Sequence, residues 1–195
     1  MIISRYLIFS LLLCCAGAAL FSGCTDVDQQ SIPLKQPTSH ADDQESINDA
    51  KTTWITIPIT DAITGKQTTI ADLATSGKPI IIHTFAVWCP ACSIQLRETA
   101  KLVQSNPDAY TILGIDIDPR ENAELVQRHI EKNQLTGMYV AAPPEMTRSL
   151  MDTIGDQIIR SLPQTIIICN KSVTYIGDGV FAESRLETIL SELCQ

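Results

Sequence analysis

The sequence predicts an α/β domain built on a central mixed β-sheet flanked by helices. Three observations lead to this prediction. Two long, mostly apolar runs at residues 80–85 and 110–117 are typical of strands that are buried on both faces. Segments with helical spacing of apolar residues alternate with these runs. A hairpin and a last helix then close the sequence, which indicates that the strands do not all run in one direction.

The composition is typical of one globular domain with some additional chain. The protein has 195 residues, of which 45% are hydrophobic and 18% are charged. Its formal net charge is −8, and its Lys and Arg residues form no cluster in the sequence. Because binding to nucleic-acid phosphates requires concentrated positive charge, we expect no nucleic-acid partner.

The N-terminal segment is expected to lie outside the domain. Residues 1–23 begin with a positive charge, continue in an apolar run at 6–20 and end in small residues, which is the order of an export signal. The apolar run is shorter than the roughly 20 residues that a membrane-spanning helix needs. Residues 24–50 are polar and acidic without an apolar period, so we expect a flexible tether before a domain at 51–195.

The end of the export signal resembles a lipoprotein lipobox, in which small residues precede a cysteine. Here Ser22 and Gly23 precede Cys24. The resemblance implies cleavage before Cys24 and a diacylglyceryl group on its sulfur. The alternative is an uncleaved signal anchor. In either case we expect the domain to lie outside the cytoplasmic membrane and to be anchored to it.

The first part of the domain is predicted to contain a hairpin, a short helix and a buried strand. Residues 54–59 alternate apolar and polar side chains, and residues 66–70 are rich in β-forming residues. The turn at 61–65 between them ends in glycine, so we expect an N-terminal β-hairpin. A helical turn at 71–75 leads to the strand at 80–85.

The later elements follow from apolar periodicity and from the residues that begin and end helices. Apolar residues at 96, 100 and 103 have helical spacing after the cysteines, and Pro107 follows the end of that helix. The further predicted elements are strand 110–117, helix 121–134, strand 137–141, helix 144–154, hairpin strands 165–169 and 173–176, and helix 183–193.

Two cysteines separated by two other residues carry the clearest chemical signal. Cys89-Pro90-Ala91-Cys92 begins a helix directly after a buried strand. A helix N-terminus carries about half a positive charge, so it stabilises a thiolate and lowers the pKa of the thiol below the free value of about 8.5. We expect Cys89 to be the exposed nucleophile. Cys92, one turn further along, would resolve the mixed disulfide that Cys89 forms with a partner.

A metal site is the alternative interpretation of the same spacing. Tetrahedral zinc requires two further ligands, and the other histidines and cysteines of the domain do not supply a second pair at suitable spacing. A metallochaperone that binds copper or zinc through Cys89, Cys92 and His83 remains the alternative function. Asp116 and Asp118 stand at the end of a strand, and we interpret them as residues that cap the loop leading to the next helix. We expect no bound cofactor.

The sequence resembles the thioredoxin-like fold family. Trp88 and the cysteine pair follow one buried strand, and Leu162 with Pro163 precedes another. The N-terminal hairpin and the helix–strand insertion at about 121–142 resemble the membrane-anchored TlpA/ResA-type branch, which consists of thiol–disulfide oxidoreductases. The resemblance covers about residues 53–193.

The resemblance assigns roles to individual residues. It implies that a cis peptide bond precedes Pro163, that Pro163 lies against the cysteine pair, and that the backbone of Leu162 pairs with the substrate chain. Trp88 and Pro90 then flank the substrate. His83 stands six residues before Cys89, where thioredoxin has a buried acid. It is a candidate base for the proton of Cys92, and a structural, hydrogen-bonded histidine is the alternative.

The remaining cysteines suggest a second bridge. The seven cysteines are Cys14, Cys15, Cys24, Cys89, Cys92, Cys169 and Cys194. Cys169 ends a strand that turns straight back. A strand of five residues covers about 17 Å and a helix of eleven about 16 Å, so the end of the last helix returns to Cys169. A structural disulfide between Cys169 and Cys194 is one hypothesis, and two free thiols are the other.

These observations predict a lipid-anchored, extracytoplasmic thiol–disulfide oxidoreductase. By resemblance to the TlpA/ResA-type branch, we expect it to reduce disulfides of partner proteins and to receive electrons from another redox protein. The opposite direction, in which it oxidises dithiols of its partners, stays open, because the residues between two such cysteines tune the reduction potential.

Overall fold

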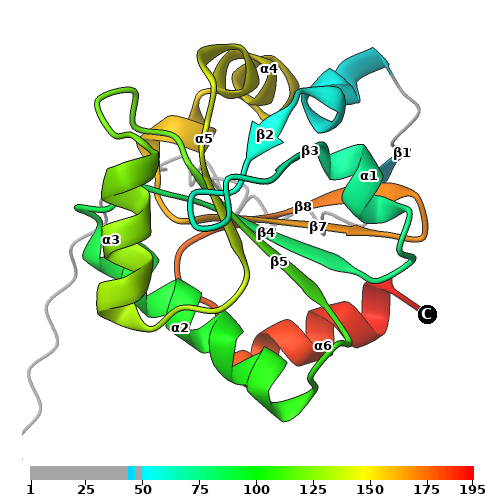
Figure 1. The fold of residues 1–195 in the computed structure, drawn as a ribbon. Coiled ribbons are helices and arrows are strands. Elements are labelled where there is room, and N and C mark those ends of the chain that lie inside the picture. The colour runs from blue at the N-terminus through cyan, green and yellow to red at the C-terminus, as the bar shows by residue number, and fades with distance from the viewer. Residues whose placement is uncertain (1–43, 47–49) are drawn as a thin grey trace, which may run out of the picture. The chain divides into compact units, whose positions relative to one another are not determined.

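Figure 1 shows the fold in a computed structural model, which describes residues 44–46 and 50–195. The predicted signal peptide, Cys24 and most of the predicted tether lie outside these residues. Within the described residues, no helix combines the length and the apolar character needed to cross a membrane.

A six-stranded mixed sheet forms the centre of the domain, in the order β1-β8-β7-β4-β5-β6. Strands β4, β5 and β6 run parallel to one another, and β7 is antiparallel to both β4 and β8. The short strand β1 forms one edge of the sheet, antiparallel to β8. The bounds are β1 Gln44–Ser46, β4 Ile80–Phe85, β5 Thr111–Asp116, β6 Met138–Ala141, β7 Gln164–Cys169 and β8 Ser172–Asp178.

The side chains of the central strand β4 alternate between the two faces of the sheet, so they pack against a different layer of helices on each face. Ile80 and Ile82 pack into one core cluster, whereas Ile81 packs into another with residues of α2 (Pro90–Ser105) and α6 (Glu183–Leu193). All six residues of β4 are buried, as expected for a strand covered on both faces.

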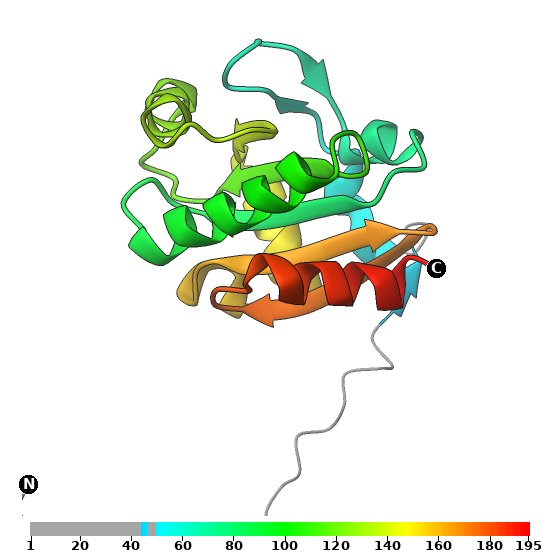
Figure 2. The ribbon, with the colours of Figure 1, turned by 90° about the horizontal axis from the view of Figure 1, so that it is seen from below.

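Helices cover both faces, so the predicted central mixed sheet flanked by helices is confirmed. One face carries α2, α3 (Ala123–Asn133) and α6, and Figure 2 shows α2 and α6 running across this face. The other face carries the 3₁₀ helix η1 and three α-helices. Their bounds are η1 Ala50–Thr56, α1 Ile70–Ala74, α4 Pro144–Ile154 and α5 Gln157–Arg160.

The N-terminal hairpin is shorter than the sequence predicts. Strands β2 (Ile59–Thr60) and β3 (Gln67–Thr68) pair antiparallel, but the residues before β2 form η1 and not a strand. Trp54 and Ile55 are both buried, with 0% and 3% of their surface exposed. Adjacent residues of a strand point to opposite faces, so a helical turn is the conformation that buries both in the same core cluster.

Two further elements were not predicted. Gln44–Ser46, within the segment expected to be a tether, pairs with β8 as edge strand β1. Helix α5 follows α4 after Gly155, and its four residues are too few to show an apolar period in the sequence. The predicted ranges of β4, α4 and α6 agree with the structure.

Candidate active site

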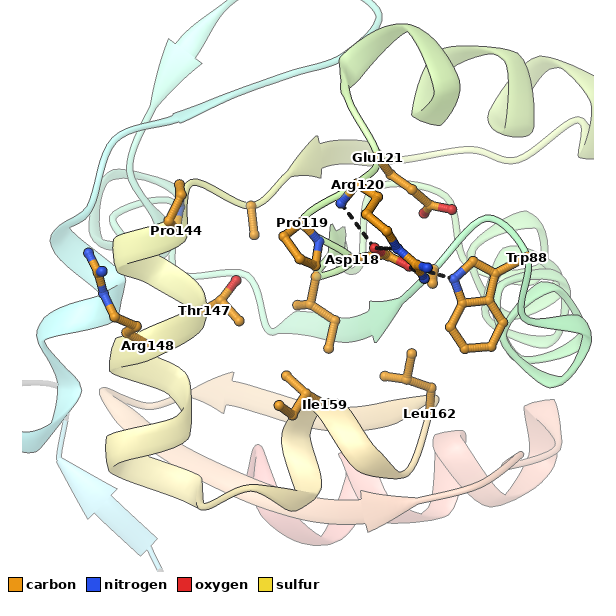
Figure 3. Close-up of a pocket in the computed structure, with 13 residues that line it drawn as sticks. Trp88, Asp118, Pro119, Arg120, Glu121, Pro144, Thr147, Arg148, Ile159 and Leu162 are labelled. Carbon is orange, nitrogen blue, oxygen red and sulfur yellow. Dashed lines mark hydrogen bonds and ion pairs between the residues drawn. The ribbon is translucent and has the colours of Figure 1, made fainter.

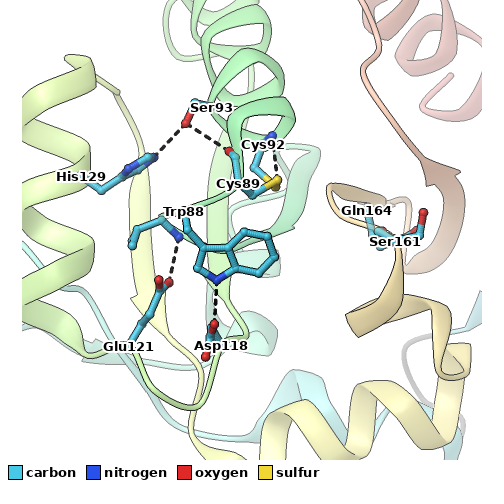
Figure 4. Close-up of a disulfide and its surroundings, with 10 residues drawn as sticks. Trp88, Cys89, Cys92, Ser93, Asp118, Glu121, His129, Ser161 and Gln164 are labelled. Atoms are coloured by element: carbon cyan, nitrogen blue, oxygen red, sulfur yellow. Dashed lines mark hydrogen bonds between the residues drawn. A yellow bond between two sulfur atoms is a disulfide. The ribbon is translucent and has the colours of Figure 1, made fainter.

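The cysteine pair lies at the start of α2, shortly after the end of the central strand β4. Cys89 is the N-cap residue of α2, and Pro90 occupies the first helical position. The sulfur of Cys89 accepts the backbone N–H of Cys92 at 3.1 Å. The two residues form a disulfide with a Cα–Cα distance of 5.3 Å (Figure 4). One of the N–H groups at the start of the helix therefore points at the sulfur of Cys89, at the helix end that carries partial positive charge.

The two sulfurs differ in their access to solvent. Cys89 retains 5% of its surface and Cys92 retains none. Cys89 is thus the more accessible of the pair, although less exposed than the sequence analysis expected, because both pack into a core cluster with Leu96 and Phe85. A partner disulfide reaches Cys89 more readily than Cys92.

The predicted proline loop borders the same core cluster. The Leu162–Pro163 peptide bond is cis, as the resemblance implies. Leu162 is partly buried and packs against the cluster that contains both cysteines. The carbonyl oxygen of Pro163 accepts the N–H of Gly179 at 3.0 Å, which joins this loop to the end of β8. Figure 4 shows the segment between Ser161 and Gln164 facing the disulfide.

Trp88 stands in front of the pair and is held by an ionic cluster. Its side chain is 61% exposed, and its indole N–H donates to the Oδ2 atom of Asp118 at 2.7 Å. The guanidinium of Arg120 donates to both carboxylate oxygens of Asp118 at 3.0 and 2.7 Å. Hydrogen bonds from Arg120 are the main reason why the pKa of Asp118 lies well below its usual range. This cluster fixes an otherwise exposed aromatic ring beside Cys89.

A cavity of about 690 Å³ extends from Trp88 along the loop after β5. In Figure 3, Trp88 and Pro144 mark its two ends, and Ile159 and Leu162 line one side. Ile159 is 40% exposed, so the cavity offers apolar surface next to the cysteine pair. A concave surface that combines apolar and polar side chains is typical of ligand-binding sites.

His83 is fully buried and belongs to a hydrogen-bonded network. Its Nε2 atom lies 2.7 Å from the hydroxyl of Thr99 on α2, and its Nδ1 atom lies 3.1 Å from the hydroxyl of Thr165 on β7. Burial lowers its pKa to about 4, so the imidazole is neutral at pH 7. Both ring nitrogens are engaged by hydroxyl groups and not by Cys92. This geometry favours the structural interpretation of His83.

A contact between a buried and a half-buried carboxyl group was missed by the sequence analysis. Asp116 is 1% exposed, and the side chain of Glu121 lies against it. The Oε2 atom of Glu121 accepts the backbone N–H of Val87 at 2.8 Å. Asp116 does cap the following loop, as predicted, by accepting the N–H of Asp118 at 3.0 Å. The contact between Glu121 and Val87 joins residues 34 positions apart, so no local sequence pattern predicts it.

Comparisons with known proteins agree with this architecture. No family model matches the chain. A bifunctional thioredoxin reductase/thioredoxin of Mycobacterium leprae is 27% identical over 81 residues, which are 42% of this chain and 17% of the relative.

Two solved structures resemble nearly the whole described domain. A secreted disulfide oxidoreductase of Mycobacterium tuberculosis, homologous to E. coli DsbE, has a TM-score of 0.57 and 17% identity, covering 72% of this chain and 98% of that one. A thioredoxin-family thiol:disulfide interchange protein of Chlorobium tepidum has a TM-score of 0.57 and 21% identity, covering 70% and 91%. The chain has a thioredoxin-like fold.

The second cysteine pair lies at the opposite end of this thioredoxin-like domain. Cys169 ends β7, and Cys194 caps the C-terminal end of α6. The structure joins them in a disulfide with a Cα–Cα distance of 5.6 Å, so the geometry assumed for this bridge in the sequence analysis is present. Ile168 pairs with Ile80 at the start of β4, whereas Cys89 follows the end of β4.

The described residues offer no obvious metal centre. Among residues 44–46 and 50–195, no group of three or more His, Cys, Asp or Glu side chains is arranged to hold a metal ion. His83, the third ligand of the metallochaperone alternative, directs its ring nitrogens to two threonines instead.

Proposed function

We propose that this protein is a thiol–disulfide oxidoreductase in which Cys89 attacks a partner disulfide and Cys92 resolves the resulting mixed disulfide. The observation that carries the proposal is the position of the Cys89 sulfur, which caps α2, accepts the N–H of Cys92 and is bonded to the Cys92 sulfur. The same N–H group and the positive end of the helix stabilise a thiolate after reduction, so Cys89 becomes a nucleophile near neutral pH.

The reaction conserves electrons and protons. The Cys89 thiolate attacks one sulfur of the partner disulfide, forms a mixed disulfide and releases the other partner sulfur as a thiolate, which takes a proton from water. Cys92 loses its proton and attacks the Cys89 sulfur, releasing the second partner sulfur. The partner gains two electrons and two protons, and the Cys89–Cys92 disulfide forms. A separate redox protein then reduces this disulfide and closes the cycle.

Substrate recognition is proposed to combine backbone pairing with an apolar groove. Leu162 precedes the cis proline and borders the cysteine cluster, so its backbone is available to pair with an extended partner chain. Trp88 and Pro90 flank the reacting sulfur, and the cavity beside Trp88 takes neighbouring side chains.

Reduction of partner disulfides is the direction that we propose, on the basis of the sequence resemblance to the TlpA/ResA-type branch. Oxidation of partner dithiols is the second candidate, since the same couple works in both directions. Reduction of partners corresponds to a reduction potential near the lower end of the range from about −270 to −120 mV, and oxidation to one near the upper end. The whole range is equivalent to a difference of about 7 kcal/mol in the stability of the disulfide.

We further propose that the domain acts outside the cytoplasmic membrane and is anchored by a lipid on Cys24. The proposal is supported by the order of charge, apolar run and small residues in positions 1–24. One structural neighbour, the Mycobacterium tuberculosis oxidoreductase, is itself a secreted protein. A Cys24→Ala variant is expected to leave the membrane fraction, and retention of this variant in the membrane would argue for an uncleaved signal anchor.

The experiment that tests the enzymatic proposal is insulin reduction with dithiothreitol as electron source. Wild-type protein is expected to accelerate precipitation of the insulin chains, and Cys89→Ser is expected to reduce the rate to background. Cys169→Ser serves as the matched control, because it removes one sulfur from the same domain at the opposite end of β4. Wild-type activity no higher than that of Cys89→Ser would refute the proposal.

A further inference from the structure

A buried carboxyl group lies next to the segment that leads into the active site. Asp116 is the last residue of β5 and pairs in register with Phe85, the last residue of β4. One of its oxygens, Oδ1, accepts the N–H of Asp118. The other oxygen, Oδ2, is buried and has no hydrogen-bond partner among the described residues. A buried polar atom without a partner is rare and needs a physical explanation.

Glu121 supplies the explanation because its carboxyl group lies against that of Asp116. Asp116 is buried and Glu121 is half-buried, so negative charges on both carboxyl groups would repel each other at short range, and one of the groups keeps a proton. A proton on Oδ2 of Asp116 turns the unpartnered acceptor into a donor to Glu121. Burial, followed by the contact with Glu121, raises the pKa of Asp116 to about 8, in agreement with this arrangement.

Glu121 in turn reaches the active-site segment. Its Oε2 atom accepts the N–H of Val87, which lies two residues before Cys89. We propose that Asp116 and Glu121 share one proton and form a positioning pair, which holds the Val87–Cys89 segment and makes the reactivity of Cys89 depend on the protonation of the pair. The inference rests on the proposed function, since it takes Cys89 as the reacting thiol.

The pair is expected to change state when it loses its shared proton. The second negative charge then repels the first, weakens the hydrogen-bonded chain to Val87 and disfavours a thiolate at Cys89. The charged groups that act on the pair are Asp118 and Arg120 in the same loop and His129 on α3. Asp118 adds a like charge to the pair, and Arg120, the nearby cation, is shared with Asp118 in an ion pair.

The first test follows the Asp116 carboxyl carbon by NMR in oxidised protein from about pH 2.5 to 10. The expected result is an apparent pKa near 8, measured on a resonance that is absent from Asp116→Asn. A carboxyl that titrates near the ordinary value of about 3.9 would overturn the shared proton. This measurement requires no redox activity, so its outcome is independent of whether the proposed function holds.

The second test measures how the pair affects Cys89. In reduced protein, the rate of Cys89 alkylation by iodoacetamide is expected to show a second inflection near pH 8, beyond the ionisation of the thiol itself. Asp116→Asn keeps a hydrogen-bond donor to Glu121 but removes the titration, so this inflection is lost. If the profiles of wild type and Asp116→Asn coincide, the positioning role is wrong.

Two further variants keep the test decisive if Asp116→Asn fails to fold. Glu121→Gln removes the neighbouring like charge, so both the Asp116 titration and the second inflection are expected to move to lower pH. Glu124→Gln is the matched control, since Glu124 is exposed and pairs with Arg128 on α3. The control is expected to keep the wild-type profile, and a Glu121→Gln profile that also matches wild type would contradict the proposal.

Discussion

The two disulfides of this domain have nearly the same span but opposite surroundings. Their Cα–Cα distances are 5.3 and 5.6 Å. Cys89 caps the N-terminus of α2, where the helix carries partial positive charge, whereas Cys194 caps the C-terminus of α6, where the partial charge is negative. Reduction therefore produces a favoured thiolate at Cys89 and a disfavoured one at Cys194.

The length of chain that each bond closes differs as well. The cysteines of the first pair are 3 residues apart, and those of the second pair are 25 apart. A bridge over a longer segment removes more conformational freedom from the unfolded chain. The comparison teaches that two disulfides of similar geometry can have different roles, which are set by their surroundings. Helix polarity favours exchange at the first pair, and loop length favours stabilisation by the second.

Removal of the second bridge is the largest change in stability that we predict. The double variant Cys169→Ser, Cys194→Ser is expected to lose about 3 to 4 kcal/mol in free energy of unfolding, from the loop-closure dependence on a segment of this length. Denaturant unfolding of the oxidised proteins measures the difference. Replacement of Cys89 and Cys92 by serine is expected to cost less, because that bridge closes a shorter loop.

The same double variant also tests whether the roles are separate. Its insulin-reduction rate, measured well below its unfolding temperature, is expected to stay close to that of wild type. A loss of activity as complete as that of Cys89→Ser would show that the second bridge takes part in exchange, and the distinction between the two pairs would fail.

His83 contacts elements that carry both disulfides, since it bonds to α2 through Thr99 and to β7 through Thr165. Its pKa is lowered by burial to about 4, from about 6.5 in the unfolded chain. At a pH between these two values, His83 binds a proton in the unfolded state and not in the folded state. The stabilising effect of a neutral His83 is therefore complete above about pH 6.5 and declines as the pH falls to about 4.

A pH-dependent effect is therefore expected for His83→Gln, whose amide can hydrogen-bond to the two threonines. The variant should lose less stability on acidification than wild type, by about 1.4 kcal/mol per pH unit within that window. Denaturant unfolding at several pH values checks this slope. The pH profile of Cys89 alkylation is expected to stay unchanged, and a shifted profile would instead support the role of His83 as a base for Cys92.

Long, unambiguous patterns allowed most of the fold to be predicted from sequence. The run at 80–85 and the amphipathic segment at 183–193 have few competing interpretations, and their bounds agree with the structure. The alternation at 54–59 was misleading, because the same residues also fit a helical turn that buries Trp54 and Ile55 together. Tertiary packing, which local patterns do not contain, decided between the two.

The candidate site was predicted where chemistry depends on neighbours in the sequence, and missed where it depends on neighbours in space. Cys89 and Cys92 are one helical turn apart, so their contact follows from the spacing. Asp116 and Asp118 were interpreted as loop caps, and the structure adds the bond from Asp118 to Trp88. The contact of Glu121 with Val87 arises from the meeting of two strand ends, which no spacing rule predicts.

The measurement that tests the central claim most directly is a redox titration of both disulfides in one protein, read by differential alkylation and mass spectrometry. The account predicts that Cys89–Cys92 equilibrates between about −270 and −120 mV, whereas Cys169–Cys194 stays oxidised down to below about −300 mV. Equal midpoints, or reduction of Cys169–Cys194 at the higher potential, would contradict it.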